Sequence, residues 1–289
     1  MDIIKNCEMS KYTSFKAGGK ADTLVIPKSL DELKEVLIWL SKEKSAYMVM
    51  GNGSNLLVSD SGFEGTIVKI DDEFSEITAE EYELTAGAGA LMSKVAKAAL
   101  AEELAGFEFA SGIPGSIGGA VFMNGGAYGH EMKDIVKHVK VLSKDGSKEF
   151  NMSADELKFS YRHSILHETG DIITRVTLKL TKGSTDEIKE KMRELTELRN
   201  EKQPVSLPSA GSFFKRPSGY FAGKLIQDAG LKGLSVGGAK ISELHAGFIV
   251  NDKNATATDI IDLMHLVQNT VYDKFGVRLE PEVRIIGDY

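Results

Sequence analysis

The feature that most constrains this chain is the stretch between Ser111 and Gly129, SGIPGSIGGAVFMNGGAYG, which is dense in glycine and carries no charged side chain. Each glycine costs a helix about 1 kcal/mol relative to alanine, so the stretch is not expected to be a stable surface helix. Apolar residues such as Ile113 and Phe122 exclude a solvated linker. We therefore expect an ordered loop whose backbone lies against a ligand, with amide groups that bind phosphate oxygens. The loop predicts a site for a dinucleotide-sized cofactor.

A second glycine-rich loop, Gly51-Asn52-Gly53-Ser54-Asn55-Leu56, lies between two apolar segments that are predicted strands, 46–50 and 66–70. It begins like a Rossmann fingerprint but lacks the third glycine and the helix that should follow. Taken alone, the loop is better explained by a tight turn than by a phosphate-binding loop. Together, the two loops favour a pair that encloses a long pyrophosphate ligand.

Composition limits the class of protein. The chain has 289 residues, enough for two domains or for one large and one small domain, with 42% hydrophobic and 27% charged residues. The formal net charge of -7 argues against a nucleic-acid surface. The single cysteine, Cys7, excludes an intramolecular disulfide and fits a reducing compartment. No signal peptide or membrane span is recognisable, so we expect a soluble cytoplasmic protein without membrane insertion.

Capping boxes and apolar periodicity predict the main elements. Helices are expected over about 29–44, 91–105, 184–200 and 258–275, and strands over 82–85, 136–142, 172–180 and 278–286. The composition changes after residue 200, where we place a domain boundary.

Several polar groups are open to two interpretations. His163 and His167 have the spacing of a helical zinc pair, but no glutamate or third ligand accompanies them, so no metal site is predicted. Ser212 stands beside two phenylalanines and two cations, which is also the pattern of a turn with buried rings. Glu282 and Arg284 would share one face of a strand, where an ordinary ion pair is the alternative.

The order of the motifs is more specific than any one of them. TSFKAGGKAD, GNGSNLLVSD, the glycine-rich stretch, YRHS, SAGSFFKRP, AGKLIQDAGLKG, HAGFIVN and LEPEVRIIG follow one another over nearly the whole chain. In this order the chain resembles the UDP-N-acetylenolpyruvoylglucosamine reductase (MurB) family of flavoenzymes.

The resemblance implies an α+β fold. Residues 1–200 would form an FAD-binding domain of the vanillyl-alcohol oxidase (PCMH) type with subdomains of about 1–72 and 73–200, and residues 201–289 a small α+β substrate domain. It also implies non-covalent FAD, NADPH as reductant, and UDP-N-acetylglucosamine enolpyruvate as substrate. Reduced flavin would deliver hydride to the terminal methylene carbon of the enolpyruvyl group.

The resemblance also implies roles for individual residues. Arg162 and Glu282, the latter protonated, would stabilise the enol-like species, and Ser212 would donate the proton to the adjacent carbon. The implied substrate-binding residues are Lys202, Lys215, Lys224 and Arg284, with Gln227 and His245 as weaker candidates. The implied cofactor-binding residues are Gly51, Asn52, Gly53, Ser54, Asn55, Leu56, Ser111, Gly112, Ile113, Pro114, Gly115, Ser116, Gly118, Gly119, Ala120, Asn124 and Gly126.

Two features separate this chain from other members of the family. Arg216 stands where other members carry an asparagine after the SFFK lysine. The segment from Tyr161 to Asp171 is short, which resembles the subtype of the family that lacks an extra tyrosine-bearing substrate loop. Tyr128 or Tyr220 is the candidate to cover the uridine instead. The alternatives are a flavin oxidase with the same fold and a non-catalytic flavin or sugar-nucleotide sensor. The sequence does not fix the oligomeric state.

Overall fold

The computed structural model describes all residues, 1–289, and divides the chain into two compact units. The first unit comprises Met1–Ile4, Leu24–Asn52 and Thr66–Leu198. The second comprises Lys5–Thr23, Gly53–Gly65 and Arg199–Tyr289. Segments from near the N-terminus thus share a unit with the C-terminal residues, whereas the predicted domains are consecutive stretches of sequence. The predicted boundaries at about 72 and 200 stay predictions.

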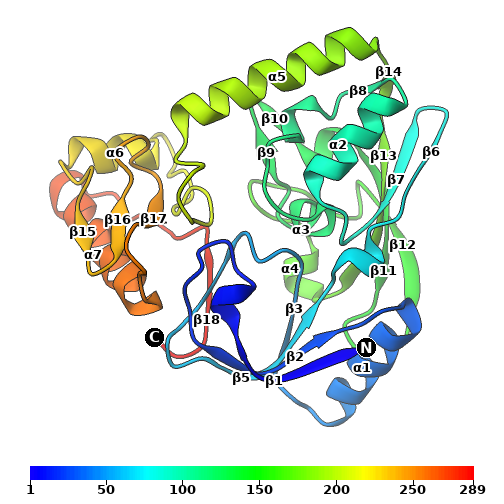
Figure 1. Cartoon of the computed structure of the whole chain (residues 1–289), viewed down its shortest axis with the longest axis horizontal. Coiled ribbons are helices and arrows are strands. Elements are labelled where there is room, and N and C mark those ends of the chain that lie inside the picture. Colours follow the sequence, from blue (N-terminus) through cyan, green and yellow to red (C-terminus); the bar gives the residue numbers. More distant parts are fainter. The chain divides into compact units, whose positions relative to one another are not determined.

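A five-stranded sheet of order β12-β11-β13-β7-β6 forms the centre of the first unit, and all its pairings are antiparallel. The strands are β6 (Ile77–Glu80), β7 (Glu83–Gly87), β11 (Val136–Leu142), β12 (Glu149–Ser153) and β13 (Ile172–Lys179). Helices α2 (Met92–Ala101) and α3 (Ile117–Phe122) lie on one face of this sheet (Figure 1).

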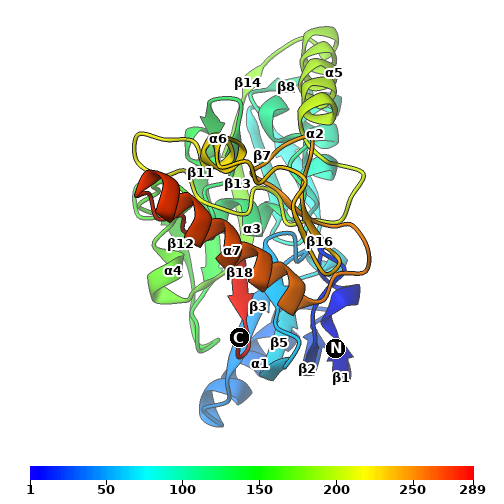
Figure 2. The ribbon, with the colours of Figure 1, turned by 90° about the vertical axis from the view of Figure 1, so that its left-hand side faces the viewer.

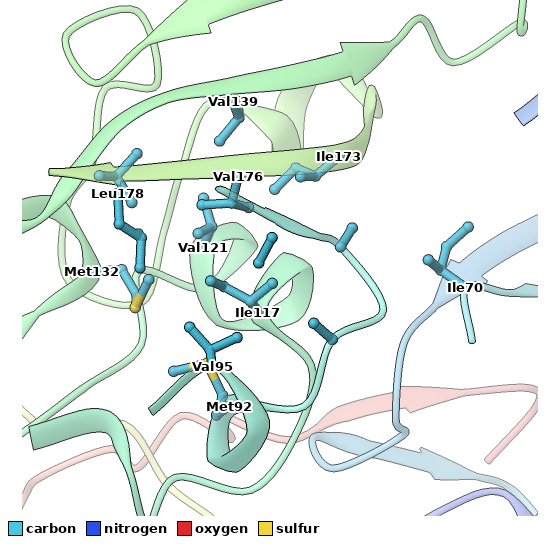
Figure 3. Close-up of a cluster of buried hydrophobic side chains, with 14 of the residues drawn as sticks. Ile70, Met92, Val95, Ile117, Val121, Met132, Val139, Ile173, Val176 and Leu178 are labelled. Atoms are coloured by element: carbon cyan, nitrogen blue, oxygen red, sulfur yellow. The ribbon is translucent and has the colours of Figure 1, made fainter. Parts of the chain in front are cut away.

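The core of the first unit lies between that sheet and the two helices. Figure 3 shows Ile117 and Val121 of α3 beneath Val176 of β13, with Met92 and Val95 of α2 on the other side of α3. All five side chains are fully buried. Part of the glycine-rich stretch is therefore a helix rather than the loop that we expected throughout. Contact with the core compensates for its low helix propensity.

A four-stranded sheet has the order β1-β2-β5-β3. Its strands are β1 (Asp2–Glu8), β2 (Lys20–Ile26), β5 (Phe63–Lys69) and β3 (Tyr47–Met50), and β3 pairs with β5 in parallel. Helix α1 (Leu30–Lys42) contributes Leu33, Leu37 and Leu40 to the first unit's core. The hydroxyl of Ser29 accepts a hydrogen bond from the Glu32 N–H at 3.2 Å and so begins this helix.

The second unit has its own core. A three-stranded antiparallel sheet, β15 (Ser235–Val236), β16 (Ala239–Ile241) and β17 (Ile249–Asn251), packs against α7 (Ala257–Phe275), and α6 (Ala222–Asp228) contacts α7 (Figures 1 and 2). The short strands β4 (Leu56–Val58) and β18 (Arg284–Ile286) pair in parallel. Phe15, Phe213 and Leu57 are fully buried in this core.

The remaining elements are short, apart from one long helix. They are β8 (Leu104–Ala105) paired with β14 (Thr181–Lys182), β9 (Gly126–Ala127) paired with β10 (His130–Glu131), α4 (Leu166–Thr169), and α5 (Thr185–Lys202). Four 3-10 turns lie at Met9–Lys11, Asp72–Phe74, Glu108–Ala110 and Met132–Asp134. None of the helices is both long enough and apolar enough to cross a lipid bilayer.

Most of the predicted elements are confirmed. Two boundaries were wrong. The helix expected over 91–105 ends at Ala101, because Glu103 adopts a left-handed φ of +55° and Leu104–Ala105 pairs as β8. The strand expected over 278–286 is only Arg284–Ile286. The prediction that no helix follows the first glycine loop is confirmed, since β4 follows it.

Candidate active site and cofactor site

The two glycine-rich loops touch each other in the first unit. A Cβ atom built on Gly51 would lie 2.2 Å from the Ser116 Oγ and 3.3 Å from the Ser116 Cβ. With Ser116 in this rotamer, only glycine fits at position 51. Segments far apart in sequence therefore form one surface, as the pairing of the loops predicted.

This surface offers backbone donors. The N–H groups of Gly51, Asn52, Gly115 and Gly119 make no hydrogen bond to the protein, and Gly115 is buried. A buried N–H without an acceptor is costly, and a phosphate oxygen would satisfy it. The residues present therefore fit the pyrophosphate part of FAD.

The other predicted cofactor residues differ in exposure. Leu56 and Gly118 are buried within the fold, and the Gly118 N–H donates to the Ala88 carbonyl at 2.9 Å. Pro114, like Asn52 and Gly119, is exposed. Partly exposed are Gly51, Ser54, Asn55, Ser111, Gly112, Ile113, Ala120 and Gly126, while Gly53, Gly115 and Ser116 are buried.

Asn124 is fully buried, and both polar atoms of its side-chain amide are hydrogen-bonded to the protein. The Nδ2 donates to the Glu131 Oε2 at 3.1 Å and to the Ser160 carbonyl at 3.0 Å, while the Oδ1 accepts from the Lys133 N–H at 3.0 Å. An amide nitrogen has two hydrogens to donate. Both are used, so the side chain has no donor left for a cofactor.

Arg162 lies in a two-residue turn of the first unit. Ser160 and His163 exchange both backbone hydrogen bonds, at 3.0 and 3.2 Å, with Tyr161 and Arg162 between them. Arg162 has a φ of +55°, and its guanidinium carbon lies 5.3 Å from the centre of the Tyr161 ring. A left-handed conformation costs a non-glycine residue about 1–2 kcal/mol. The fold therefore maintains an unfavourable backbone conformation at Arg162, the residue predicted to stabilise the enol-like species.

Ser212 and Glu282 are brought together in the second unit. Phe214 and Pro281 form an antiparallel bridge, in which the Lys215 N–H donates to the Glu280 carbonyl and the Glu282 N–H donates to the Phe213 carbonyl, both at 2.8 Å. This pairing joins the SFFK motif to the EPEVR motif. Both predicted catalytic side chains are half-buried.

The Ser212 hydroxyl makes no hydrogen bond to the protein, and a Cβ atom built on the neighbouring Gly211 would meet nothing within 4 Å. Open space therefore borders Gly211, while the side chain of Ser212 itself is half-buried. Lys215 forms an ion pair with Glu280, with 3.4 Å between Nζ and Oε2.

The glycine loop also supports the Glu282 segment. The Asn55 Nδ2 donates to the Glu282 carbonyl, and the Arg284 N–H donates to the Asn55 carbonyl, both at 3.1 Å. Asn55, predicted as a cofactor residue, thus also fixes the backbone on both sides of Val283.

The remaining predicted cations are exposed at separate places. Lys202 ends α5, Lys224 pairs with Asp228 on α6 at 2.5 Å, and Arg284 lies in β18. An exposed pair of this kind is worth about 0.2–1 kcal/mol, so it leaves Lys224 available to an anionic ligand. Gln227 is exposed on α6.

His245 is linked through Gly247 to the segment that carries Ser212. Its Nδ1 accepts from the Gly247 N–H at 3.0 Å, and the Gly247 carbonyl accepts from the Phe213 N–H at 2.8 Å. Burial lowers the pKa of His245, which keeps the ring neutral at pH 7 and able to accept that hydrogen bond.

Sequence reasoning gave no role to the residues that hold the SFFK segment. The ring of Phe15 packs edge-to-face on Phe213 with 6.1 Å between centroids, and the Ser14 hydroxyl donates to the Ser209 carbonyl at 2.6 Å. The Asn251 Nδ2 donates to the Phe15 carbonyl at 2.9 Å. The motifs TSFK and HAGFIVN contain these residues and were the available signal.

The two histidines considered as a zinc pair, and the tyrosines considered as uridine contacts, have the following surroundings. His163 and His167 stack at 4.9 Å, and His167 stacks on Phe122 at 3.9 Å. The Tyr128 hydroxyl donates to the Leu195 carbonyl at 2.9 Å, while Tyr220 is exposed. Arg216 lies over the ring of Phe221 at 4.0 Å.

Comparison with known families gives two matches. Residues 203–286 match the model of the UDP-N-acetylenolpyruvoylglucosamine reductase C-terminal domain, and residues 21–149 match that of an FAD-binding domain.

Individual proteins are similar over nearly the whole chain. The UDP-N-acetylenolpyruvoylglucosamine reductase of Caldanaerobacter subterraneus subsp. tengcongensis is 52% identical over 283 residues, covering 98% of this chain and 93% of the relative. The enzyme of the same name from Clostridioides difficile is 48% identical, covering 99% and 94%. The crystal structure of this reductase from Thermus caldophilus superposes with a TM-score of 0.84 at 37% identity, covering 98% of both chains.

Proposed function

The chain belongs to the UDP-N-acetylenolpyruvoylglucosamine reductase family, and from this premise we propose that it reduces UDP-N-acetylglucosamine enolpyruvate to UDP-N-acetylmuramate at the expense of NADPH. The expected fold class, an FAD-binding domain joined to this family's C-terminal domain, is confirmed. The expected FAD-containing oxidoreductase is confirmed with it.

Bound FAD would supply the redox chemistry, namely hydride transfer between NADPH and the enolpyruvyl group of the substrate. The glycine loops around Gly51 and Ser116 would hold the pyrophosphate of FAD through N–H groups that make no hydrogen bond to the protein. As hydride reaches the terminal methylene carbon, negative charge develops on the adjacent carbon and the carboxylate.

Side chains of this protein stabilise that negative charge and supply the proton. Arg162 supplies a fixed cation, and Glu282 in its protonated form donates a hydrogen bond to the enol-like species. The Ser212 Oγ donates the proton that completes the saturated product. Lys202, Lys215, Lys224 and Arg284 bind the substrate's carboxylate and diphosphate through charge-assisted hydrogen bonds.

One observation carries the assignment of roles. The antiparallel bridge between Phe214 and Pro281 places the segments of Ser212 and Glu282 side by side, although 69 positions separate Phe213 from Glu282, which share a hydrogen bond. The half-buried Ser212 makes no side-chain hydrogen bond within the protein, which leaves its hydroxyl proton available to a ligand.

Partners and location follow from the same proposal. The enolpyruvyl sugar nucleotide and NADPH are the small-molecule partners, and the reaction takes place in the cytoplasm. Cys7 is free and buried, which fits a reducing compartment. We place the substrate domain at 201–289 and the FAD-binding domain at 1–200, with subdomains divided near residue 72.

Anaerobic spectroscopy tests the proposal. The purified protein, reconstituted with FAD, should be yellow, lose its visible absorbance on addition of NADPH, and regain it rapidly when the enolpyruvyl sugar nucleotide is added. UDP-N-acetylglucosamine without the enolpyruvyl group is the control and should not restore the colour.

Each alternative gives a different result. Recovery only with oxygen, accompanied by peroxide, would identify a flavin oxidase. A protein that binds FAD but is not bleached by NADPH would fit a flavin-binding sensor. A protein that takes up no FAD would contradict the cofactor assignment.

A further inference from the structure

Asn124, just beyond the end of α3 in the glycine-rich stretch, is hydrogen-bonded to the turn that carries Arg162. Its Nδ2 donates to the carbonyl of Ser160, which is the first residue of that turn. Its side-chain amide also donates to the Glu131 carboxylate and accepts from the Lys133 N–H, so both polar atoms of the side chain are used. The residue therefore holds the turn rather than offering a surface to a ligand.

The backbone of Asn124 is as constrained as its side chain. It ends α3 with a φ of +44°, its N–H donates to the Val121 carbonyl at 3.0 Å, and the Gly125 N–H donates to the Ala120 carbonyl at 2.7 Å. These two bonds are those of a Schellman cap, which favours glycine or asparagine at this position. Asparagine alone combines the left-handed backbone with an amide that reaches Ser160.

A second contact anchors the other end of the turn. Ser164 is fully buried, and its hydroxyl donates to the Phe122 carbonyl at 2.7 Å. The turn from Ser160 to His163 is thus attached on both sides to the last residues of α3 and those just beyond it. Arg162 lies between these two attachments in a left-handed conformation that it would not adopt by itself.

We propose that Asn124 is a positioning residue that sets the place of the Arg162 guanidinium by holding the Ser160 carbonyl, and that it does not contact the flavin. The inference rests on the proposed function only for the role of Arg162. Its structural part, the link between Asn124 and the turn, is independent of substrate.

Transient kinetics on the FAD-loaded protein tests the catalytic part. Asn124→Asp keeps the shape and the tolerance for a left-handed backbone but replaces the donor to Ser160 by an acceptor. Reoxidation of the reduced flavin by the enolpyruvyl sugar nucleotide should slow about 10- to 100-fold, the usual effect of a misplaced catalytic group. Reduction by NADPH and the visible flavin spectrum should not change. Asn151→Asp, at an exposed position on β12, is the matched control and should behave as wild type.

A double variant separates positioning from other effects. If Asn124 acts through Arg162, then Asn124→Asp should cause no further slowing in an Arg162→Ala background. Additive losses, slower reduction by NADPH, an altered flavin spectrum or an unchanged reoxidation rate would each overturn the proposal.

Hydrogen exchange tests the structural part. In Asn124→Asp, the amides of Ser160 and His163 should exchange faster, while those of β11 and β13 keep their protection. Unchanged exchange in the turn would overturn the link. This readout stands even if wild-type protein is not reoxidised by the sugar nucleotide, a result that would instead reject the proposed function.

Asn124→Gly covers the case in which the aspartate variant does not fold. Glycine satisfies the Schellman cap and removes only the amide. It should give the same selective loss of reoxidation. If neither variant folds, the residue serves folding and the proposal is overturned.

Discussion

Arg162 combines an unfavourable backbone conformation with a side chain assigned to catalysis. Residues in such conformations persist where the surrounding structure determines them fully, and they concentrate at functional sites. Here the surrounding structure is the hydrogen-bonded pair Ser160 and His163, held by Asn124 and Ser164. The chain thus keeps Arg162 at some cost to stability.

A pair of variants measures that cost. Both Arg162→Ala and Arg162→Gly lose the guanidinium and should lose reoxidation by substrate alike. Glycine adopts a φ of +55° without strain, so the glycine variant should be more stable to urea than the alanine variant by about 1 kcal/mol. Equal stability of the two variants would show that the backbone is not strained there.

Ser212 is the residue whose removal should affect only one half-reaction. A general acid contributes about 10²–10⁴-fold, so Ser212→Ala should slow flavin reoxidation by substrate by that factor and leave reduction by NADPH intact. Stopped-flow absorbance of the flavin separates the two steps. Ser218→Ala, exposed in the same segment, is the control. Equal losses in both steps would remove Ser212 from the role of proton donor.

At the scale of elements, helix α3 shows how packing reverses a local preference. Gly118 faces Ala88, the residue after β7: a Cβ atom there would lie 2.8 Å from the Ala88 Cβ and 2.9 Å from the Ala88 carbonyl oxygen. Gly119, the next residue in the same helix, is exposed, and its Cβ would meet only the Ser116 Oγ at 3.5 Å.

Two glycine-to-alanine variants should therefore have opposite effects. Helix propensity alone favours alanine by about 1 kcal/mol at either position. Gly118→Ala should instead destabilise the protein by about 1–3 kcal/mol, because the added methyl group pushes α3 away from Ala88. Gly119→Ala should be neutral or stabilising. Urea unfolding of the flavin-free protein measures both, and stabilisation by both would mean that α3 is free to shift.

Helix α7 begins at a carboxylate from a distant segment. The Asp60 carboxylate accepts from the N–H groups of Ala257 and Thr258 at 3.0 and 2.7 Å, and from the Thr258 hydroxyl at 2.7 Å. Partial burial acts to raise the pKa of Asp60, but these hydrogen bonds outweigh it and lower the pKa below its ordinary value.

The stability of this cap should depend on pH. Because the folded-state pKa is lowered, the contribution is complete above the ordinary aspartate pKa of about 3.9 and disappears as the pH falls through the folded-state pKa. At pH 7, Asp60→Asn should cost about 1 kcal/mol, and the difference from wild type should vanish in strong acid. Asp262→Asn, exposed on α7, is the control in the same urea titrations. A difference that persists in acid would mean that the charge does not matter.

At the scale of the whole molecule, each compact unit has its own buried core. Strands β1, β2 and β5 and helix α5 pass from one unit into the other, since the boundaries fall within these elements. The glycine loop 51–56 also crosses a boundary, between Asn52 and Gly53. A ligand that binds this loop only in the folded state is expected to stabilise the protein.

FAD should raise the melting temperature in proportion to the logarithm of its concentration once its concentration exceeds Kd. A ligand at about 100 times its Kd stabilises the folded state by about 2.7 kcal/mol, which corresponds to several degrees. Riboflavin, which lacks the pyrophosphate, should give a smaller shift in the same thermal melts. A riboflavin shift as large as that of FAD would contradict the assignment of the glycine loops to the pyrophosphate.

Local sequence patterns were enough to predict the four longest helices, several strands and the family. Apolar periodicity and caps such as Ser29 depend on neighbours within one turn, and motif order does not depend on geometry at all. The contacts between distant residues became known from the tertiary structure. Gly51 lies against Ser116, the Ser212 segment pairs with the Glu282 segment, and the Asn124 amide donates to the turn of Arg162. These contacts join positions far apart along the chain. Patterns among neighbouring residues therefore do not predict which buried amide or hydroxyl donates to which carbonyl. For the same reason Asn124 was predicted as a cofactor residue, whereas the structure shows its amide fully engaged by the protein.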